Sequence, residues 1–155
     1  MIDAYLFDWG DTLMVDFPGT PGKMCDWKTV QAVDGASEAL KCLSKSANVY
    51  IATGASESSV ADIRRAFNRV GLDQFVSGYF CKSNVGCSKG SPTFLPIILS
   101  LLALPASRVA MVGDSFTKDI EPAMRTDIQP IWLTQETAPQ GTNIRVIRSL
   151  RKLCI

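Results

Sequence analysis

The feature that most constrains this fold is a set of short apolar runs, each of which leads into a polar residue. Three runs have this form, at residues 2–8, 48–52 and 108–112. The first ends at Asp8, and the others lead to Thr53 and Asp114. Runs of this length and continuity are typical of parallel strands buried on both faces. Open α/β sheets place their chemistry at the carboxyl ends of such strands, so these side chains are candidate site residues.

Segments with helical spacing of apolar residues lie between the strand-like runs. Helices are predicted over residues 35–46, 56–70, 91–103, 117–125 and 144–153, and further strands over residues 77–81 and 129–133. Ser56 is the predicted N-cap of the second helix, with Glu57 in its first turn and Gly71 at its end. Strands that alternate with helices predict an α/β fold, with a doubly wound, mostly parallel sheet in a three-layer α/β/α sandwich.

Size and charge narrow the classes of function. The 155 residues are predicted to form one domain, residues 1–155, with a substantial core. The net charge of +1 indicates neither a nucleic-acid footprint nor a membrane-surface patch. The longest apolar stretch, residues 94–104, is too short to span a bilayer. With no signal peptide at the N-terminus, a cytoplasmic location is expected.

The cysteine and histidine content limits the chemistry further. Five cysteines form an odd number without a C-x-x-C pair, which predicts scattered reduced thiols and not a disulfide or zinc site. The chain has no histidine, so acid–base work would fall to carboxylates. Any metal is expected to be a hard cation held by oxygen atoms.

Eight residues, taken in order, carry a resemblance to a known family. They are Asp8, Thr12, Leu13, Thr53, Lys89, Gly113, Asp114 and Asp119. Together they resemble the motifs of the haloacid dehalogenase (HAD) superfamily of aspartate-nucleophile hydrolases, most of which are phosphatases. The resemblance covers nearly the whole chain and implies a HAD-like Rossmannoid fold.

Many members of that family carry a cap domain over the site. Here about 40 residues separate Leu13 from Thr53, and about 35 separate Thr53 from Lys89, so a full cap does not fit. Residues 14–34 are predicted to be a loop or minimal cap. The site is therefore expected to be open, either for a large substrate or for coverage by a neighbouring subunit in a homo-oligomer.

The resemblance implies a Mg²⁺-dependent phosphomonoester phosphatase that acts through an aspartyl-phosphate. Asp8 would be the nucleophile, and Asp8, Asp114 and the main-chain carbonyl of Gly10 would bind the metal. Asp119 would not bind the metal directly, but would hold Lys89 or a metal-bound water in position.

Thr53 and Lys89 are assigned to the phosphoryl group of the substrate. Thr53 would hydrogen-bond a phosphoryl oxygen, assisted by the Gly54 amide near the start of the next helix. Lys89 would neutralise Asp8 and the transferred group. Lys82 and Lys118 compete for that role, and Lys89 is favoured because Pro92 and a helix follow it as in the family.

Gly10 departs from the family pattern. The family has a second aspartate there, which protonates the leaving oxygen and later activates water. We hypothesise that Asp11 partly replaces it, although Asp11 also suits a turn residue with an unusual backbone angle. An aspartyl-phosphate formed here is expected to be long-lived, and Gly10→Asp to shorten its lifetime.

Three interpretations follow from Gly10. The first is a phosphatase that uses Asp11 or the acidity of the leaving group. The second is a dehalogenase- or phosphonatase-type hydrolase, which the retained Asp114 and Asp119 and the missing cap disfavour. The third is a weakly active or inactive module that binds phosphate and metal. The first is favoured, and its phosphorylated substrate is not specified.

Two tryptophans and one loop bear on substrate selection. Trp9 and Trp27 either line the open site or are buried next to a turn, and the second alternative is favoured. Long loops near a strand end often carry selectivity, so residues 18–27 are the best candidate for it.

Overall fold

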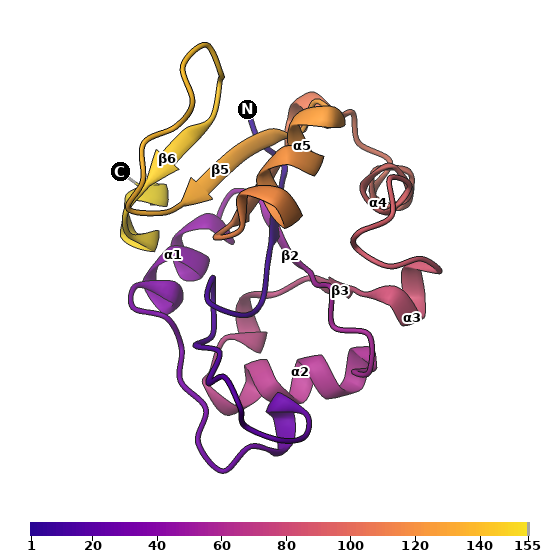
Figure 1. The fold of residues 1–155 in the computed structure, drawn as a ribbon, viewed down its shortest axis with the longest axis vertical. Helices are drawn as coiled ribbons and strands as arrows, with labels where there is room; N and C mark the ends of the chain where they lie inside the picture. Colours follow the sequence, from indigo (N-terminus) through magenta and orange to yellow (C-terminus); the bar gives the residue numbers. More distant parts are fainter. Residues whose placement is uncertain (155) are drawn as a thin grey trace.

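The computed structural model describes residues 1–154 and contains one six-stranded parallel sheet (Figure 1). Its strands are β1 (Ala4–Phe7), β2 (Asn48–Ala52), β3 (Gly78–Phe80), β4 (Val109–Gly113), β5 (Gln129–Leu133) and β6 (Arg145–Ile147). They lie in the order β3-β2-β1-β4-β5-β6. The chain runs outward from β1 to β3, then crosses to β4 and runs outward the other way. The doubly wound fold is therefore confirmed, with its switch point between β1 and β4.

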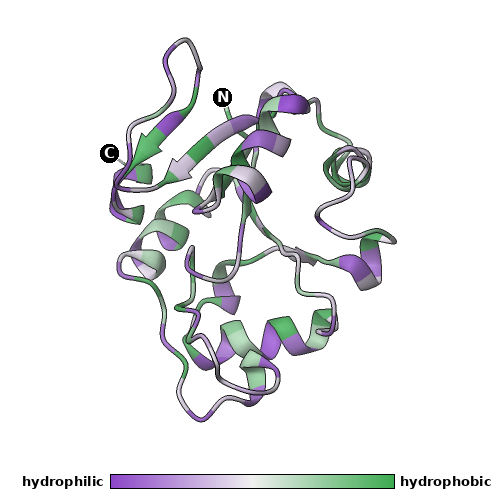
Figure 2. Cartoon of the chain, in the orientation of Figure 1, coloured by the Kyte–Doolittle hydropathy of each residue, from purple (hydrophilic) through white to green (hydrophobic). Residues whose placement is uncertain are grey.

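The helices form layers on both faces of the sheet. They are α1 (Ala36–Leu43), α2 (Val60–Arg69), α3 (Lys82–Val85), α4 (Phe94–Leu102) and α5 (Glu121–Arg125). Short 3-10 turns are η1 (Met24–Asp26), η2 (Asp73–Phe75), η3 (Ala106–Arg108) and η5 (Leu150–Cys154), and η4 (Phe116–Ile120) is a π-helical turn. Hydrophilic and hydrophobic residues alternate along α2, as expected for a helix with one face on the sheet (Figure 2).

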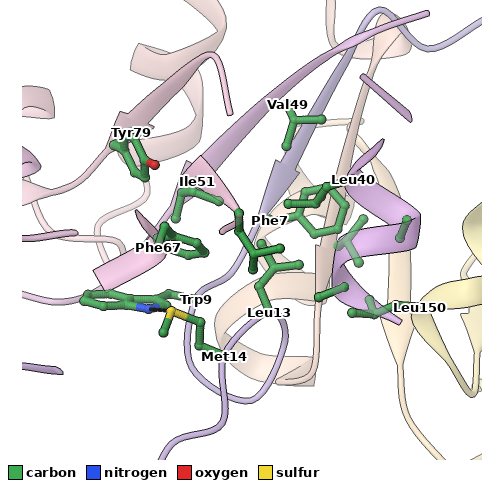
Figure 3. Close-up of a cluster of buried hydrophobic side chains, with 14 of the residues drawn as sticks. Phe7, Trp9, Leu13, Met14, Leu40, Val49, Ile51, Phe67, Tyr79 and Leu150 are labelled. Atoms are coloured by element: carbon green, nitrogen blue, oxygen red, sulfur yellow. Dashed lines mark hydrogen bonds between the residues drawn. The ribbon is translucent and has the colours of Figure 1, made fainter. Parts of the chain in front are cut away.

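Alternating side chains of the central strands divide the core into two clusters. Phe7 packs with α1, α2 and η5 on one face, and Leu6 packs with α4 and α5 on the other. Figure 3 shows the first cluster, in which Trp9 and Leu13 continue the packing beyond the end of β1. The residues that begin the site are therefore anchored in the core.

Two predicted helices differ from the structure. The second predicted helix begins at Val60, because Ser59, and not Ser56, accepts from the Asp62 amide and forms a capping box with it. The predicted helix over residues 144–153 is wrong. Residues 145–147 form β6, because pairing with the free edge of β5 outweighs the helical spacing, and only a 3-10 turn follows.

The prediction of scattered reduced thiols is wrong for one pair. Cys42 of α1 and Cys154 of η5 form a disulfide with Cα atoms 6.4 Å apart, across 112 positions in sequence. Packing of η5 against α1 brings the two together, which cysteine spacing alone does not reveal. Cys25, Cys81 and Cys87 are free.

Within residues 1–154, no helix is both long and apolar enough to cross a bilayer. No cap-sized insertion interrupts the sheet and its helices there.

Candidate active site

The three strand-end residues predicted from sequence lie at the carboxyl edge of the sheet. The Asp8 amide donates to Val112 O of β4 at 3.0 Å, and the Thr53 amide donates to Phe80 O of β3 at 3.0 Å. Asp114 follows β4 directly. These backbone bonds continue the pairing of the strands, so the sheet fixes where the side chains start.

Lys89 reaches this edge from the loop after α3. Its Nζ lies 2.8 Å from Asp8 Oδ1 and 2.5 Å from Asp119 Oδ1, and its side chain is only 8% exposed. Burial opposes the charge of the ammonium, but Asp8 and Asp119 outweigh it and raise the pKa of Lys89. Of the two competing lysines, Lys118 lines the same cavity, whereas Lys82 is an exposed residue of α3.

Thr12 has a role that the sequence analysis did not assign. Its buried hydroxyl lies 3.2 Å from Asp8 Oδ2 and 3.1 Å from Asp114 Oδ1, and it donates to these carboxylates. Its place in the motif of residues 8–13 was the available signal. Thr12 thus holds two carboxylates side by side at the switch point.

Asp119 depends on Gly113 for its position. A Cβ atom on Gly113 would lie 2.2 Å from Asp119 Oδ2, so the carboxylate occupies space that any other residue would fill. The same oxygen accepts from the Ser115 amide at 3.1 Å. The π-helical turn η4 carries Asp119 back over the end of β4, and such turns are frequent at functional sites.

The carboxylates fit a hard divalent cation. Asp8, Asp114 and Asp119 offer oxygen atoms within 4.8 Å of one another. Burial, together with Asp8 and Asp119, raises the pKa of Asp114 to about 6. Asp119 Oδ1 is buried without a well-formed hydrogen bond and is balanced by its ion pair with Lys89. This excess of closely spaced negative charge is what a cation such as Mg²⁺ would relieve.

The Gly10 carbonyl is available as a further oxygen donor. Within residues 1–154 no hydrogen-bond donor contacts this oxygen. The turn is closed instead by the Asp11 amide, which donates to Met14 O, and by the Met14 amide, which donates to Trp9 O. The predicted set of Asp8, Asp114 and Gly10 is therefore compatible with Mg²⁺.

Asp16, a residue that the sequence analysis missed, lies beside Gly10. A Cβ atom on Gly10 would lie 3.6 Å from Asp16 Cβ and 3.9 Å from Asp16 Oδ2. Asp11 is exposed, has a φ of 59°, and accepts from the Asp16 amide at 2.9 Å. No motif marks Asp16, since only the folded loop brings it to this position.

Thr53 is oriented by its own turn. Its hydroxyl accepts from the Ala55 amide at 3.1 Å, which leaves the hydroxyl proton free for a ligand oxygen. The expectation that Gly54 lies near the start of a helix is wrong, because α2 begins only at Val60. The Gly54 amide can still act as an ordinary backbone donor.

Two neighbouring cavities open at this edge of the sheet. The carboxylate cavity, of about 600 Å³, is lined by Asp8, Lys89, Asp114 and Asp119. The loop cavity, of about 630 Å³, is lined by Trp9, Lys23, Met24, Trp27 and Thr53. Both are also lined by Gly10, Asp16 and Ala55. Trp9 is buried next to the turn, as the favoured sequence interpretation predicts, and is only 5% exposed, whereas Trp27 is partly exposed on the loop cavity.

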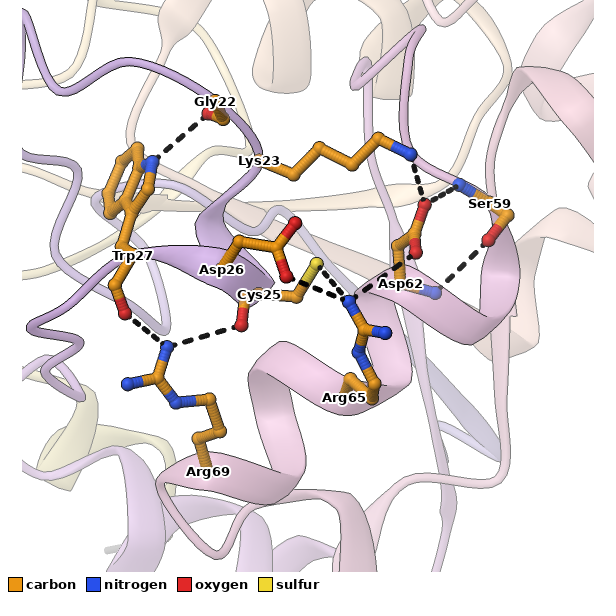
Figure 4. A network of polar contacts seen from close by, with 9 residues as sticks. All are labelled: Gly22, Lys23, Cys25, Asp26, Trp27, Ser59, Asp62, Arg65 and Arg69. Carbon is orange, nitrogen blue, oxygen red and sulfur yellow. Dashed lines mark hydrogen bonds and ion pairs between the residues drawn. The ribbon is translucent and has the colours of Figure 1, made fainter.

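The wall of the loop cavity is tied to α2 (Figure 4). Arg69 donates to the carbonyls of Cys25 at 3.2 Å and Trp27 at 2.5 Å. Arg65 pairs with Asp26, and Lys23 pairs with Asp62. The segment around η1 is thus held at several points, which favours a preformed cavity.

A comparison with protein families decides the assignment. A family model described as haloacid dehalogenase-like hydrolase matches residues 20–125. The chain belongs to this family. The match includes Thr53, Lys89, Asp114 and Asp119 and starts after Asp8. No curated protein matches the chain.

Solved structures share the fold, and several of them are described as HAD hydrolases or phosphatases. A protein of Listeria monocytogenes has a TM-score of 0.82 at 21% identity, with 96% of this chain and 93% of that chain covered. The HAD phosphatase of Thermococcus onnurineus has 0.77 at 15% identity, covering 98% and 96%. The magnesium-bound HAD-hydrolase YfnB of Bacillus subtilis has the same TM-score, identity and two coverages.

Proposed function

We propose that this HAD hydrolase is a Mg²⁺-dependent phosphomonoesterase. The observation that carries the proposal is the grouping of Asp8 with Lys89, Asp114 and Asp119 at the switch point. A carboxylate nucleophile needs neighbouring positive charge to meet a phosphoryl group, and Lys89 supplies it from a buried position. The phosphatase and the magnesium-bound hydrolase among the structural neighbours support the same class.

The proposed reaction has two displacements at phosphorus. In the first, an Asp8 oxygen forms a bond to phosphorus while the bond to the ester oxygen breaks, and the leaving group departs with the electron pair. In the second, water attacks phosphorus, the Asp8–phosphorus bond breaks, and a proton passes from water to a base or to solvent. Inorganic phosphate and free Asp8 result.

The chain's own groups would position these steps. Lys89 neutralises Asp8 and the phosphoryl oxygens, Thr53 and the Gly54 amide donate to those oxygens, and Asp119 holds Lys89. Asp8, Asp114 and the Gly10 carbonyl would hold Mg²⁺, which when bound neutralises charge on the transferred group. Asp11 and Asp16 are the candidate bases for water.

Gly10 favours one alternative, a phosphate- and metal-binding module with weak or no turnover. Gly10 lacks the proton-transferring side chain, and such a group typically raises the reaction rate about 10²–10⁴-fold. The exposed site is also compatible with a second copy of the chain covering it.

Phosphate release from a panel of phosphomonoesters, with Mg²⁺ and with EDTA, tests the proposal. Asp8→Asn is the matched control because it keeps the size of the side chain and removes the nucleophile. The phosphatase predicts metal-dependent release that the variant lacks. Release no greater than that of the variant, for every ester, would refute the phosphatase and favour the binding module.

A further inference from the structure

We infer that the loop cavity is the leaving-group site, and that the substrate is an aryl phosphomonoester with an uncharged aromatic group on the ester oxygen. The inference rests on the proposed function and names the substrate class of the same site. Three independent observations support it: the place of the cavity, the chemistry of its walls, and the absent side chain of Gly10.

The place of the cavity suits a leaving group. Gly10, Asp16 and Ala55 line both cavities, and the two proposed phosphoryl donors lie on either side of the boundary. Thr53 lines the loop cavity and Gly54 the carboxylate cavity. A phosphoryl group held by these donors beside Asp8 is thus within reach of the loop cavity. A volume of about 630 Å³ is within the 300–1,000 Å³ typical of small-molecule sites and exceeds the size of one phenyl ring.

The walls of the loop cavity favour an aromatic ligand. Trp27 supplies a partly exposed indole ring, and Trp9 and Met24, which are 5% and 8% exposed, add small parts of a second indole and of a thioether. Such groups form favourable contacts with aromatic ligands. Each indole is fixed in the free protein. Trp9 Nε1 lies 3.3 Å from Met14 Sδ, and Trp27 Nε1 donates to Gly22 O at 3.0 Å. A wall that is already ordered loses little conformational entropy when a flat ligand binds.

The charges on the loop cavity disfavour an anionic leaving group. The cation on its lining, Lys23, is paired with Asp62 at 2.8 Å. The side-chain hydrogen bond from Lys23 is the main cause that lowers the pKa of Asp62 to about 2. Asp16 and Glu57 add two carboxylates to the same lining. A leaving group with its own phosphate or carboxylate would meet net negative charge, so an uncharged ring fits better.

Gly10 points to the same class for a different reason. An alcohol has a pKa near that of water and far above that of a phenol, so an alkoxide must be protonated as it leaves. A phenol has a pKa of about 10, so the phenolate can leave with its electron pair and take its proton from solvent afterwards. The missing acid at position 10 therefore slows the hydrolysis of an aryl ester much less than that of an alkyl ester.

Three esters measured on the full chain with Mg²⁺ test the inference. They are 2-naphthyl phosphate, phenyl phosphate and decahydro-2-naphthyl phosphate, which is a saturated ester of similar shape. We expect kcat/KM for 2-naphthyl phosphate to exceed that for the saturated ester by about 100-fold. Trp27→Ala is expected to lower kcat/KM for the naphthyl ester about 10-fold, with smaller effects on the other two.

Two further variants keep the test decisive. Trp27→Phe retains an aromatic wall and is expected to restore most of the naphthyl preference. Thr29→Ala is the matched control, because Thr29 is an exposed residue of the same loop outside the cavity lining. Equal kcat/KM for the aryl and saturated esters, or a naphthyl preference unchanged in Trp27→Ala, would overturn the inference and leave the phosphatase intact. No release from any ester would instead refute the phosphatase, and the inference with it.

Discussion

Single residues around Gly10 determine how protons could move in this site. Gly10 provides no side chain, Asp11 uses one carboxylate oxygen to hold the Asp16 amide, and Asp16 lies in contact distance of the position that a Gly10 side chain would occupy. These contacts favour Asp16 as the group that activates water, with Asp11 as a positioning residue. Mutants of Asp16 and Asp11 can distinguish these two roles.

Asp16→Asn is expected to slow hydrolysis of the aspartyl-phosphate by about 100-fold. With an aryl phosphate, rapid-mixing experiments would show a burst of one phenol per enzyme, then slow turnover. Asp11→Asn keeps the oxygen that accepts from the Asp16 amide, so its effect is expected to be under about 3-fold. Gly10→Asp in the Asp16→Asn background is expected to recover part of the rate. Full activity in Asp16→Asn, with the large loss in Asp11→Asn, would assign the base to Asp11.

Asp114 makes the metal-free protein sensitive to pH. Its pKa is raised to about 6 in the folded state, against about 3.9 when unfolded, so between these values the folded state binds more protons. The free energy of unfolding therefore falls as the pH rises through this window. Because Asp114 is partly exposed, the loss is expected to be about 1 kcal/mol.

Asp114→Asn removes this ionisation. In EDTA the variant is expected to be more stable than the native protein at about pH 7 and equal to it at about pH 4. Mg²⁺ should stabilise the native protein and not the variant. Urea unfolding at the two pH values measures both effects, and a variant no more stable than the native protein at about pH 7 in EDTA would contradict the assignment.

At the scale of elements, the junction of β4 and η4 places both Asp114 and Asp119. The missing Cβ of Gly113 lets the turn return over the strand, and Asp119 then holds Lys89. Lys89 itself arrives on a loop between α3 and α4, far from β4 in sequence. One small residue thus controls the contact between two distant segments.

Gly113→Ala is expected to displace the Asp119 carboxylate and to lower stability by about 2–3 kcal/mol, as for other overpacked sites. Phosphatase activity should fall with it, because Lys89 loses a partner. Gly90→Ala is the control for stability, since a Cβ there meets nothing within 4 Å. Chemical unfolding of the two variants makes the comparison, and equal stabilities would show that the turn accommodates the methyl group.

At the scale of the whole molecule, the disulfide joins the C-terminal segment to the first helix. It closes a loop of 112 positions, so reduction releases considerable chain entropy in the unfolded state. Reduction, or Cys42→Ser with Cys154→Ser, is expected to lower stability by about 2–4 kcal/mol. Since neither cysteine lines the two cavities, kcat/KM should stay unchanged. Thermal unfolding and activity with and without reductant measure both, and equal unfolding temperatures would contradict the expectation.

Much of the fold could be predicted because its determinants are local. The apolar runs mark the central strands, and helical spacing marks α1, α4 and the turn of η4 into α5. One error arises where a tertiary contact decides, because β6 forms by pairing with the free edge of β5. The other is local, because the capping box of Ser59 and Asp62 starts α2 after the serine at position 56 that was predicted to cap it.

The sequence by itself determined the order of the strands from β1 to β5, the motif residues and the missing side chain at Gly10, because each depends on residue type and spacing. Only the tertiary structure decided which groups meet. Lys89 joins Asp8 and Asp119, Asp16 lies beside Gly10, and Cys42 meets Cys154. Each of these contacts joins residues that are distant in sequence or that a folded loop brings together. The distances between their side chains depend on how the whole chain packs.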